Sequence, residues 1–193
     1  MLDNLKKYKV ILASNSPRRK ELLGGLGIHY EVKTMPDIDE SYPAGLDAEE
    51  IPIYIARNKA DAYRSMMQND ELIITADTIV WSEGRVMGKP VNEIDAIEML
   101  QCLSGKTHQV ITGVCLTTVD KQISFATTTD VTFAELTREE IEFYVSNFQP
   151  MDKAGAYGIQ EWIGFIGVRN ISGSYFNVVG LPIQRLYTEL KKI

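Results

Sequence analysis

The sequence predicts an α/β fold, a twisted mixed β-sheet with helices on its faces. Three observations carry this prediction: an apolar run followed by a capped helix at Lys9–Gly27, a long apolar run at Glu71–Trp81, and two adjoining runs of alternating character at Gln109–Val119 and Gln122–Phe133. Strand-like runs that alternate with helical segments are typical of sheets covered by helices. The 193 residues, 45% of them hydrophobic, suit a single domain over residues 1–193.

The first strand and helix are joined by a polar turn. Lys9–Ala13 fits a buried strand, and Ser14 opens the turn that follows it. Ser16 is a good N-cap, and Pro17 suits the first helical position because its missing N–H costs nothing there. Glycines from Gly24 onward end this helix.

Arg18 and Arg19 fall in the first turn of this helix, where the positive end of the helix dipole prefers acids. Two interpretations stay open. The arginines are solvated side chains on a capped helix, or they form an anion site together with the free N–H groups and the serine hydroxyls.

Three acids lie in the loop Thr34–Leu46, which follows a strand predicted at Ile28–Lys33. Acids in a loop are usually solvated, and one of them holding a divalent cation is the alternative. Nothing local selects among the three, which are Asp37, Asp39 and Glu40.

The next helix is predicted from the N-cap Asp47 to about Gln68. Lys59 shares its apolar face with Ile55, Tyr63 and Met66. A lysine at such a position either snorkels outward or points its ammonium inward at a buried anion, and both interpretations stay open.

Asp77 and Thr78 interrupt the apolar run Glu71–Trp81. An isolated buried carboxylate costs several kcal/mol, so Asp77 must be paired, protonated or bound to a metal. Otherwise it ends the strand, which is also where α/β proteins bind ligands. Both possibilities favour a functional carboxylate.

The remaining elements follow from caps and periodicity. They are a turn at Ser82–Arg85 with a returning strand, a helix at Glu93–Leu103 capped by Asn92, a helix that starts with the capping box Thr137/Glu140 and ends before Pro150, a glycine-punctuated loop at Asp152–Gln160, a strand at Ile163–Ile171, a turn at Gly173–Pro182 and a C-terminal helix ending near Ile193. Ser104–Thr107 resembles the end of a P-loop, but Leu100 stands where the first glycine is required, so a Walker A site is excluded.

The composition excludes several classes of protein. A net charge of −6 argues against a nucleic-acid polymer as partner, although a local basic cluster can still hold a small phosphorylated ligand. The two cysteines and two histidines lack zinc spacing. No apolar run has the length of a membrane span, and Met1–Tyr8 is too polar for a signal peptide, so we expect a cytoplasmic protein without a membrane partner.

The segment SNSPRRKELL, at Ser14–Leu23, resembles the N-terminal signature of the Maf family of nucleotide pyrophosphatases. Further segments resemble that family's motifs in the same order: IARNKA, ADT, GKP, LSGKTHQVITGV, DKAGAYGIQ and GSYFNVVGLP. The resemblance covers nearly the whole chain and implies a Maf or ITPase-like fold with two lobes around a cleft.

The resemblance also implies roles for individual residues. Asp77 matches the catalytic proton acceptor, and Glu40, with Asp77, is the best match for holding a divalent metal cation, Mg²⁺ or Mn²⁺. The phosphate-binding set is similar to Ser14, Ser16, Arg18, Arg19, Lys59 and Lys89, and the positions linked to the choice of base match Arg18, Thr78 and Gln160. The loop Asp152–Gln160 resembles the branch that acts on dTTP and UTP rather than on 7-methyl-GTP.

Two positions depart from the family's pattern. Ile55 replaces a leucine, which is a neutral exchange. Glu161 and Trp162 follow Gln160 where the family usually has glycine next, and this alters the expected rim of the base pocket.

The implied function is hydrolysis of a nucleoside triphosphate to the monophosphate and pyrophosphate, as a house-cleaning enzyme. The alternatives are a nucleotide-binding regulator of cell division with little hydrolysis, a pyrophosphatase for a different modified nucleotide, and a degenerate structural relative. Whether the chain forms a homodimer is left open.

Overall fold

The computed structural model describes residues 2–193, so of the polar N-terminal segment Met1 lies outside the described residues. The chain forms two compact units. The first contains the residues up to Asp77, together with Thr112–Thr127 and Gly180–Ile193, and the second contains Thr78–Ile111 and Thr128–Val179. Two lobes were expected; the single domain over residues 1–193 and the cleft stay predictions.

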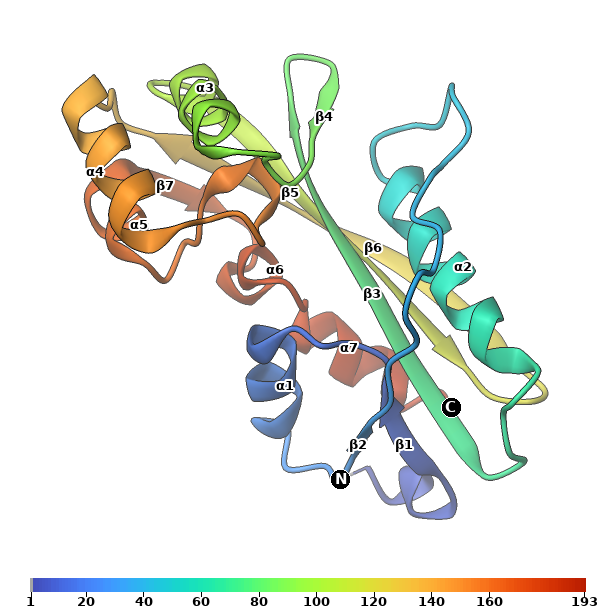
Figure 1. The fold of residues 1–193 in the computed structure, drawn as a ribbon. Coiled ribbons are helices and arrows are strands. Elements are labelled where there is room, and N and C mark those ends of the chain that lie inside the picture. The colour runs from blue at the N-terminus through green and yellow to red at the C-terminus, as the bar shows by residue number, and fades with distance from the viewer. Residues whose placement is uncertain (1) are drawn as a thin grey trace. The chain divides into compact units, whose positions relative to one another are not determined.

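Helices and strands alternate along much of the chain (Figure 1). The strands are β1 (Lys9–Leu12), β2 (Glu31–Val32), β3 (Glu71–Ser82), β4 (Arg85–Met87), β5 (Thr107–Thr117), β6 (Gln122–Phe133) and β7 (Val168–Ser172). The helices are α1 (Pro17–Gly24), α2 (Glu50–Arg64), α3 (Glu93–Leu103), α4 (Arg138–Phe148), α5 (Trp162–Gly167), α6 (Tyr175–Val179) and α7 (Ile183–Leu190), with short 3₁₀ turns η1 (Asp3–Lys7) and η2 (Ala154–Ala156).

Within the described residues, seven strands form one mixed sheet in the order β2-β1-β3-β5-β6-β7, with β4 paired to β3. β1 pairs parallel with β2 and with β3, where Val10 lies opposite Leu72. β4 pairs antiparallel with β3, and β7 antiparallel with β6. These pairings confirm the predicted mixed α/β sheet.

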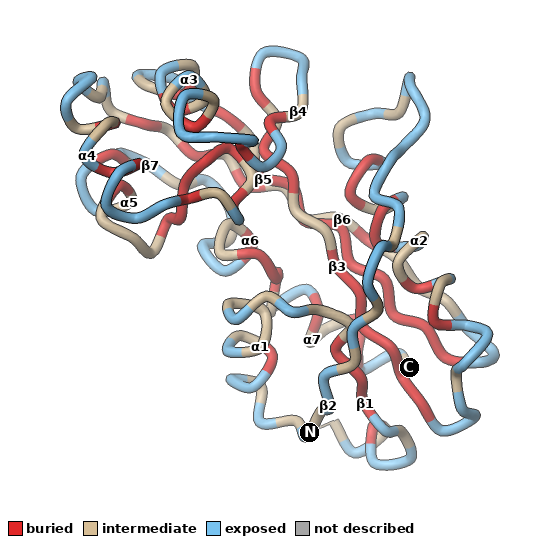
Figure 2. The backbone as a smooth tube through the Cα atoms, viewed as in Figure 1, coloured by how far each residue is buried: buried red, intermediate tan, exposed pale blue. Residues whose placement is uncertain are grey.

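In the first unit, helices cover both faces of the sheet. Successive strand residues point to opposite faces. On one face Val10, Leu12, Leu72 and Ile74 pack with residues of α1 and α7, among them Leu23, Leu186 and Leu190. On the other face Ile11 and Ile73 pack with Tyr63 of α2, and Cys115 of β5 packs with Ala56 and Ala60. β1 and the first part of β3 are therefore almost wholly buried (Figure 2).

The second unit has its own apolar core. Val80 and Met87 of the β3–β4 pair contact residues of α3 and α4, and the largest fully buried side chains there are Tyr144 and Phe133. The loop that precedes α5 adds Tyr157 and Ile159 to this core. Apolar packing against this core therefore fixes the position of the loop.

Three predicted helix caps are confirmed. The Ser16 side chain caps α1, and Asn92 Oδ1 accepts a hydrogen bond from Asp95 N at 2.9 Å at the start of α3. Thr137 and Glu140 form the reciprocal capping box of α4. Such caps act within a few residues, which is why the sequence reveals them.

Several predicted boundaries are wrong. α2 begins at Glu50 rather than directly after Asp47. In the turn before the helix, the Asp47 carbonyl accepts from the amides of Glu50 and Ile51, and Asp47 N donates to Glu50 Oε2 at 2.9 Å. α2 ends at Arg64 rather than near Gln68. Of the strand predicted at Ile28–Lys33, only the two residues of β2 form a strand.

The strand predicted at Ile163–Ile171 is wrong over its first half, which forms α5. A short apolar run fits a buried strand or a buried helix equally well. Gly164 decides between them, since a Cβ there would lie 1.9 Å from the carbonyl oxygen of Ile159. Only glycine lets α5 fold back this closely on the preceding loop. The predicted turn at Gly173–Pro182 likewise contains a helix, α6.

Across residues 2–193, each helix is too short or too polar to cross a membrane.

Candidate active site

Asp77 lies in the middle of β3, and its side chain is 13% exposed. The strand continues on both sides of it, so the alternative that Asp77 ends the strand is wrong. Thr75, two residues earlier and on the same side of the strand, donates a hydrogen bond from Oγ1 to the Ala56 carbonyl of α2 at 2.7 Å. This hydrogen bond therefore links β3 to α2 two residues from the Asp77 carboxylate.

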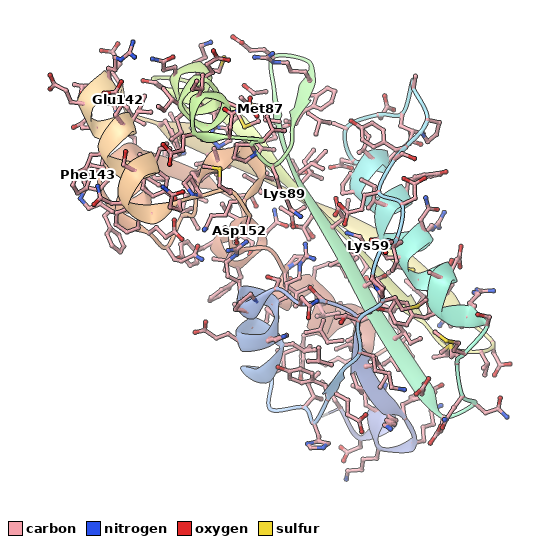
Figure 3. All side chains as sticks on the ribbon, viewed as in Figure 1. Lys59, Met87, Lys89, Glu142, Phe143 and Asp152 are labelled. Atoms are coloured by element: carbon pink, nitrogen blue, oxygen red, sulfur yellow. The ribbon has the colours of Figure 1, made fainter. Side chains whose placement is uncertain are left out.

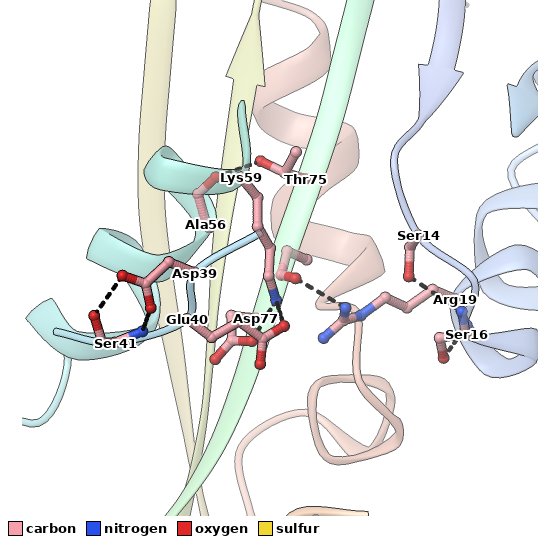
Figure 4. Close-up of polar contacts among 11 residues, drawn as sticks. Ser14, Ser16, Arg19, Asp39, Glu40, Ser41, Ala56, Lys59, Thr75 and Asp77 are labelled. Carbon is pink, nitrogen blue, oxygen red and sulfur yellow. Dashed lines mark hydrogen bonds and ion pairs between the residues drawn. The ribbon is translucent and has the colours of Figure 1, made fainter. Parts of the chain in front are cut away.

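Lys59 of α2 points inward and joins two carboxylates. Its Nζ lies 2.8 Å from Asp77 Oδ1 and 2.8 Å from Glu40 Oε1 (Figure 4). The lysine side chain is only 14% exposed, whereas that of Glu40 is 51% exposed. The inward interpretation of Lys59 is confirmed, and the anions it meets include two carboxylates of its own unit.

Glu40 is set apart from its acidic neighbour by loop geometry. Asp39 folds onto Ser41, accepting hydrogen bonds from Ser41 N and Oγ at 2.8 Å each, and these bonds lower the pKa of Asp39. Tyr63 holds the start of the same loop, because its hydroxyl donates to the Lys33 carbonyl at 3.1 Å and accepts from Met35 N at 2.9 Å. The local sequence pattern left the choice among Asp37, Asp39 and Glu40 open, and the family resemblance indicated Glu40. The structure pairs Glu40 with Lys59.

Arg19 reaches from α1 to the backbone beside Asp77. Its Nη1 donates to the Ala76 carbonyl at 2.8 Å and its Nε to the Gly180 carbonyl at 2.9 Å. Burial lowers the pKa of Arg19, while the nearby carboxylate of Asp77 acts in the opposite direction. Arginine stays protonated in proteins, so a half-buried positive charge lies near the carboxylate.

The amino end of α1 is organised by the two predicted serines. Ser16 Oγ accepts from Arg19 N at 3.4 Å, and Ser14 Oγ accepts from Ser16 N at 3.2 Å (Figure 4). Arg18 lies in the same first turn, close enough to act electrostatically on Arg19. The first unit thus gathers cations and a helix N-terminus around the Asp77 segment, an arrangement able to bind a polyanion.

The model of the family described as Maf-like protein matches residues 9–193 of this chain. The chain belongs to the Maf family. The match spans both units and every element from β1 onward.

Curated relatives of this Maf chain are similar over its full length. A protein of Phocaeicola vulgatus named dTTP/UTP pyrophosphatase is 74% identical over 193 residues, covering 100% of both chains. Proteins with the same name from Bacteroides fragilis and Parabacteroides distasonis are 67% and 60% identical, with 100% and 99% of each chain covered. Among solved structures, a HAM1 protein from Coxiella burnetii has a TM-score of 0.51 at 18% identity, with 96% of this chain and 100% of that chain covered, which speaks for the fold alone.

Three predicted site residues belong to the second unit of the Maf chain. Thr78 lies in β3, Lys89 follows β4 (Figure 3), and Gln160 lies two residues before the start of α5. Gly155 N donates to the Gly88 carbonyl at 3.0 Å, which ties the loop before Gln160 to the segment that carries Lys89. That these three residues join the first unit's residues in one site stays a prediction.

The donor set also bears on the expected divalent cation. Glu40 and Asp77 each place an oxygen 2.8 Å from the same ammonium nitrogen, so the two oxygens lie within twice that distance of each other. Among residues 2–193, no group of three or more His, Cys, Asp or Glu side chains could hold a metal. A two-carboxylate set fits Mg²⁺ or Mn²⁺, which takes its further ligands from water and substrate phosphates.

Sequence reasoning missed the residues that support the site. Thr75 and Tyr63 bond to backbone groups, and each fixes a segment that carries one of the two carboxylates. Tyr63 gave a usable signal, because it lies one helical turn after Lys59 on the same face of α2. The carbonyl contacts of Arg19 gave none, since both partners are backbone groups.

Proposed function

We propose that this Maf-family chain hydrolyses nucleoside triphosphates, with dTTP and UTP as substrates, to the nucleoside monophosphate and pyrophosphate. The names of its full-length relatives support the substrate class. One structural observation carries the chemistry: the Asp77 carboxylate, set in an apolar strand, is held 2.8 Å from the half-buried ammonium of Lys59. The contact with Lys59 orients the carboxylate, as a general base requires.

In the proposed reaction, water attacks the α-phosphorus. A new oxygen–phosphorus bond forms, the bond from the α-phosphorus to the bridging oxygen breaks, and pyrophosphate leaves. Asp77 accepts the proton of the attacking water. Phosphoryl transfer depends mainly on positioning and charge neutralisation, and Arg18, Arg19, Lys59 and Lys89 supply positive charge for the phosphates.

Glu40 and Asp77 would hold the divalent cation. When bound, that cation would neutralise phosphate charge and make the attacking water more acidic. Lys59 would then exchange its carboxylate partners for phosphate oxygens, a change that a flexible ammonium accommodates easily. The cytoplasm, where nucleoside triphosphates are consumed, is the proposed location.

The test is a pyrophosphate-release assay with dTTP, UTP and other triphosphates, with and without Mg²⁺ or Mn²⁺. In ¹⁸O-labelled water, we expect the label in the monophosphate. Asp77→Asn should still bind nucleotide but lose on the order of 10²–10⁴ in kcat, the usual contribution of a general base. Asp120→Asn, at an exposed turn position between β5 and β6, is the matched control.

An Asp77→Asn variant with wild-type turnover would remove Asp77 from this role. Binding of nucleotide by the wild-type protein without release of pyrophosphate would instead favour the regulator of cell division as the function.

A further inference from the structure

A second cluster of charged residues lies in the second unit, and the proposed reaction does not use it. Lys153 Nζ pairs with Glu161 Oε1 at 3.0 Å and with Asp152 Oδ1 at 2.7 Å. The Lys153 side chain is 9% exposed and that of Glu161 is 21% exposed, whereas Asp152 is largely exposed. A mostly buried ammonium needs a partner, and Glu161 is the less exposed of the two carboxylates.

The second oxygen of Glu161 connects this pair to the core. Glu161 Oε2 accepts a hydrogen bond from the Tyr144 hydroxyl, and the same hydroxyl accepts one from Gly158 N at 3.0 Å. Burial and the bond to Glu161 raise the pKa of Tyr144, so the phenol keeps its proton. A continuous series of contacts therefore runs from Lys153 through Glu161 and Tyr144 to the backbone of Gly158.

The segment from Gly158 to Glu161 is a tight turn closed by two separate contacts. Glu161 N donates to the Gly158 carbonyl at 3.0 Å, which makes Ile159 and Gln160 the two central residues. The Glu161 side chain also packs directly on the Gly158 backbone, since a Cβ on Gly158 would lie 2.8 Å from Glu161 Cδ. Ile159 is buried in the core, and this packing sets the orientation of the turn. That orientation sets the direction in which the Gln160 side chain leaves the backbone.

We propose that Glu161 is a positioning residue for Gln160: through Tyr144 and Lys153 it holds the Gly158–Glu161 turn and so determines which nucleobase the enzyme accepts. This inference rests on the proposed function and on the family resemblance, which matches Gln160 to a position linked to the choice of base. Hydrogen bonds to a base discriminate well only when the donor or acceptor is held still, because a mobile amide can adapt to either pattern of base edges.

The test compares UTP with CTP, which differ at position 4 of the base by a carbonyl and an amino group. We expect Glu161→Ala to lower the ratio of kcat/KM for UTP over CTP by about tenfold, mainly through KM, with kcat for UTP nearly unchanged. Glu161→Gln should have a smaller effect, because it still accepts from Tyr144 but loses its charge against Lys153. Tyr144→Phe should lower the ratio as well, and its effect should not multiply with that of Glu161→Ala.

Hydrogen exchange gives a readout independent of activity. The Gly158 amide should exchange faster in Glu161→Ala and in Tyr144→Phe than in the wild-type protein. Glu142→Ala is the matched control, since Glu142 lies on α4 like Tyr144 but pairs with Arg138 at the surface. If Glu161→Ala does not fold, Glu161→Gln and Tyr144→Phe carry the test.

Unchanged selectivity and unchanged Gly158 exchange in the folded variants would overturn the inference while leaving the proposed function intact. Failure of the proposed function is distinguishable, because the wild-type protein itself would then release no pyrophosphate, and the role in base choice would fall with it.

Discussion

Lys59 illustrates how one residue acquires a role from its surroundings. On the helix surface its neighbours are apolar, and an outward ammonium would have been unremarkable. Its inward position places one positive charge between Asp77 and Glu40. Because both carboxylates share one ammonium, removing either of them changes the interaction of the other with Lys59. The three side chains therefore act as one coupled charge cluster.

His108 gives a prediction for stability at the residue scale. The ring is buried, its Nε2 shares a hydrogen bond with the Tyr157 hydroxyl at 2.7 Å, and burial lowers the pKa of His108 from 6.5 to about 4. Between pH 6.5 and about pH 4, His108 therefore binds a proton in the unfolded chain but stays neutral in the folded chain. The free energy of unfolding should fall by about 2 kcal/mol between pH 7 and pH 5 from this residue.

The measurement is urea unfolding of the wild-type protein and of His108→Gln at both pH values. The variant should lose most of this pH dependence, and His29→Gln, which removes the exposed histidine, is the control. Equal pH dependence in the wild type and in His108→Gln would contradict the assignment.

At the scale of elements, glycines decide how closely a strand and a helix can approach. Gly113 of β5 lies against the first turn of α2, where a Cβ would sit 2.3 Å from the carbonyl carbon of Pro52 and 2.4 Å from Ile53 N. Both atoms are backbone atoms, so they cannot move aside as a flexible side chain could. The packing of α2, and with it the position of Lys59, depends on this contact.

Gly113→Ala should therefore lower the free energy of unfolding by about 1–3 kcal/mol, because overpacking forces the backbone to shift. Gly24→Ala is the control in the same unit, since a Cβ there makes only ordinary contacts of 3.9 Å with Tyr30. Urea unfolding at pH 7 measures both. A Gly113→Ala variant with the wild-type midpoint would show that β5 and α2 pack less tightly than described.

At the scale of the whole molecule, the candidate site residues are divided between two units. Asp77, Lys59 and Arg19 belong to the first, and Lys89 and Gln160 to the second. The chain passes between the units at Asp77–Thr78, next to the Ala76 carbonyl that Arg19 binds, and again at Val179–Gly180, whose Gly180 carbonyl Arg19 also binds. Arg19 thus holds the first-unit residues beside two of the points where the chain crosses from one unit to the other.

A prediction at this scale concerns Lys89. If the second unit contributes to phosphate binding, Lys89→Ala in an Asp77→Asn background should weaken binding of dTTP by about 10-fold to 100-fold, as expected for a hydrogen bond to a charged group. Binding of dTMP should weaken less, because dTMP lacks the β- and γ-phosphates that Lys89 is predicted to contact.

Isothermal titration calorimetry with both nucleotides measures the two losses. Lys106→Ala is the control in the same unit, because Lys106 pairs with Glu83 at the surface. Equal losses for dTTP and dTMP would argue against a contact between Lys89 and the phosphate tail.

Local sequence patterns were sufficient for features that depend on a few neighbouring residues. The caps at Ser16, Asn92 and Thr137, the buried strand around Asp77 and the family motifs could all be predicted, because local hydrogen bonds and side-chain periodicity lie close together in the chain. The three-dimensional structure was needed to show the pairing of Glu40 with Lys59, the carbonyls that Arg19 binds, the helical form of α5 and the contacts by which Glu161 holds the Gln160 turn. Those outcomes depend on contacts between distant segments, and burial of apolar surface brings such segments together without leaving a local signal.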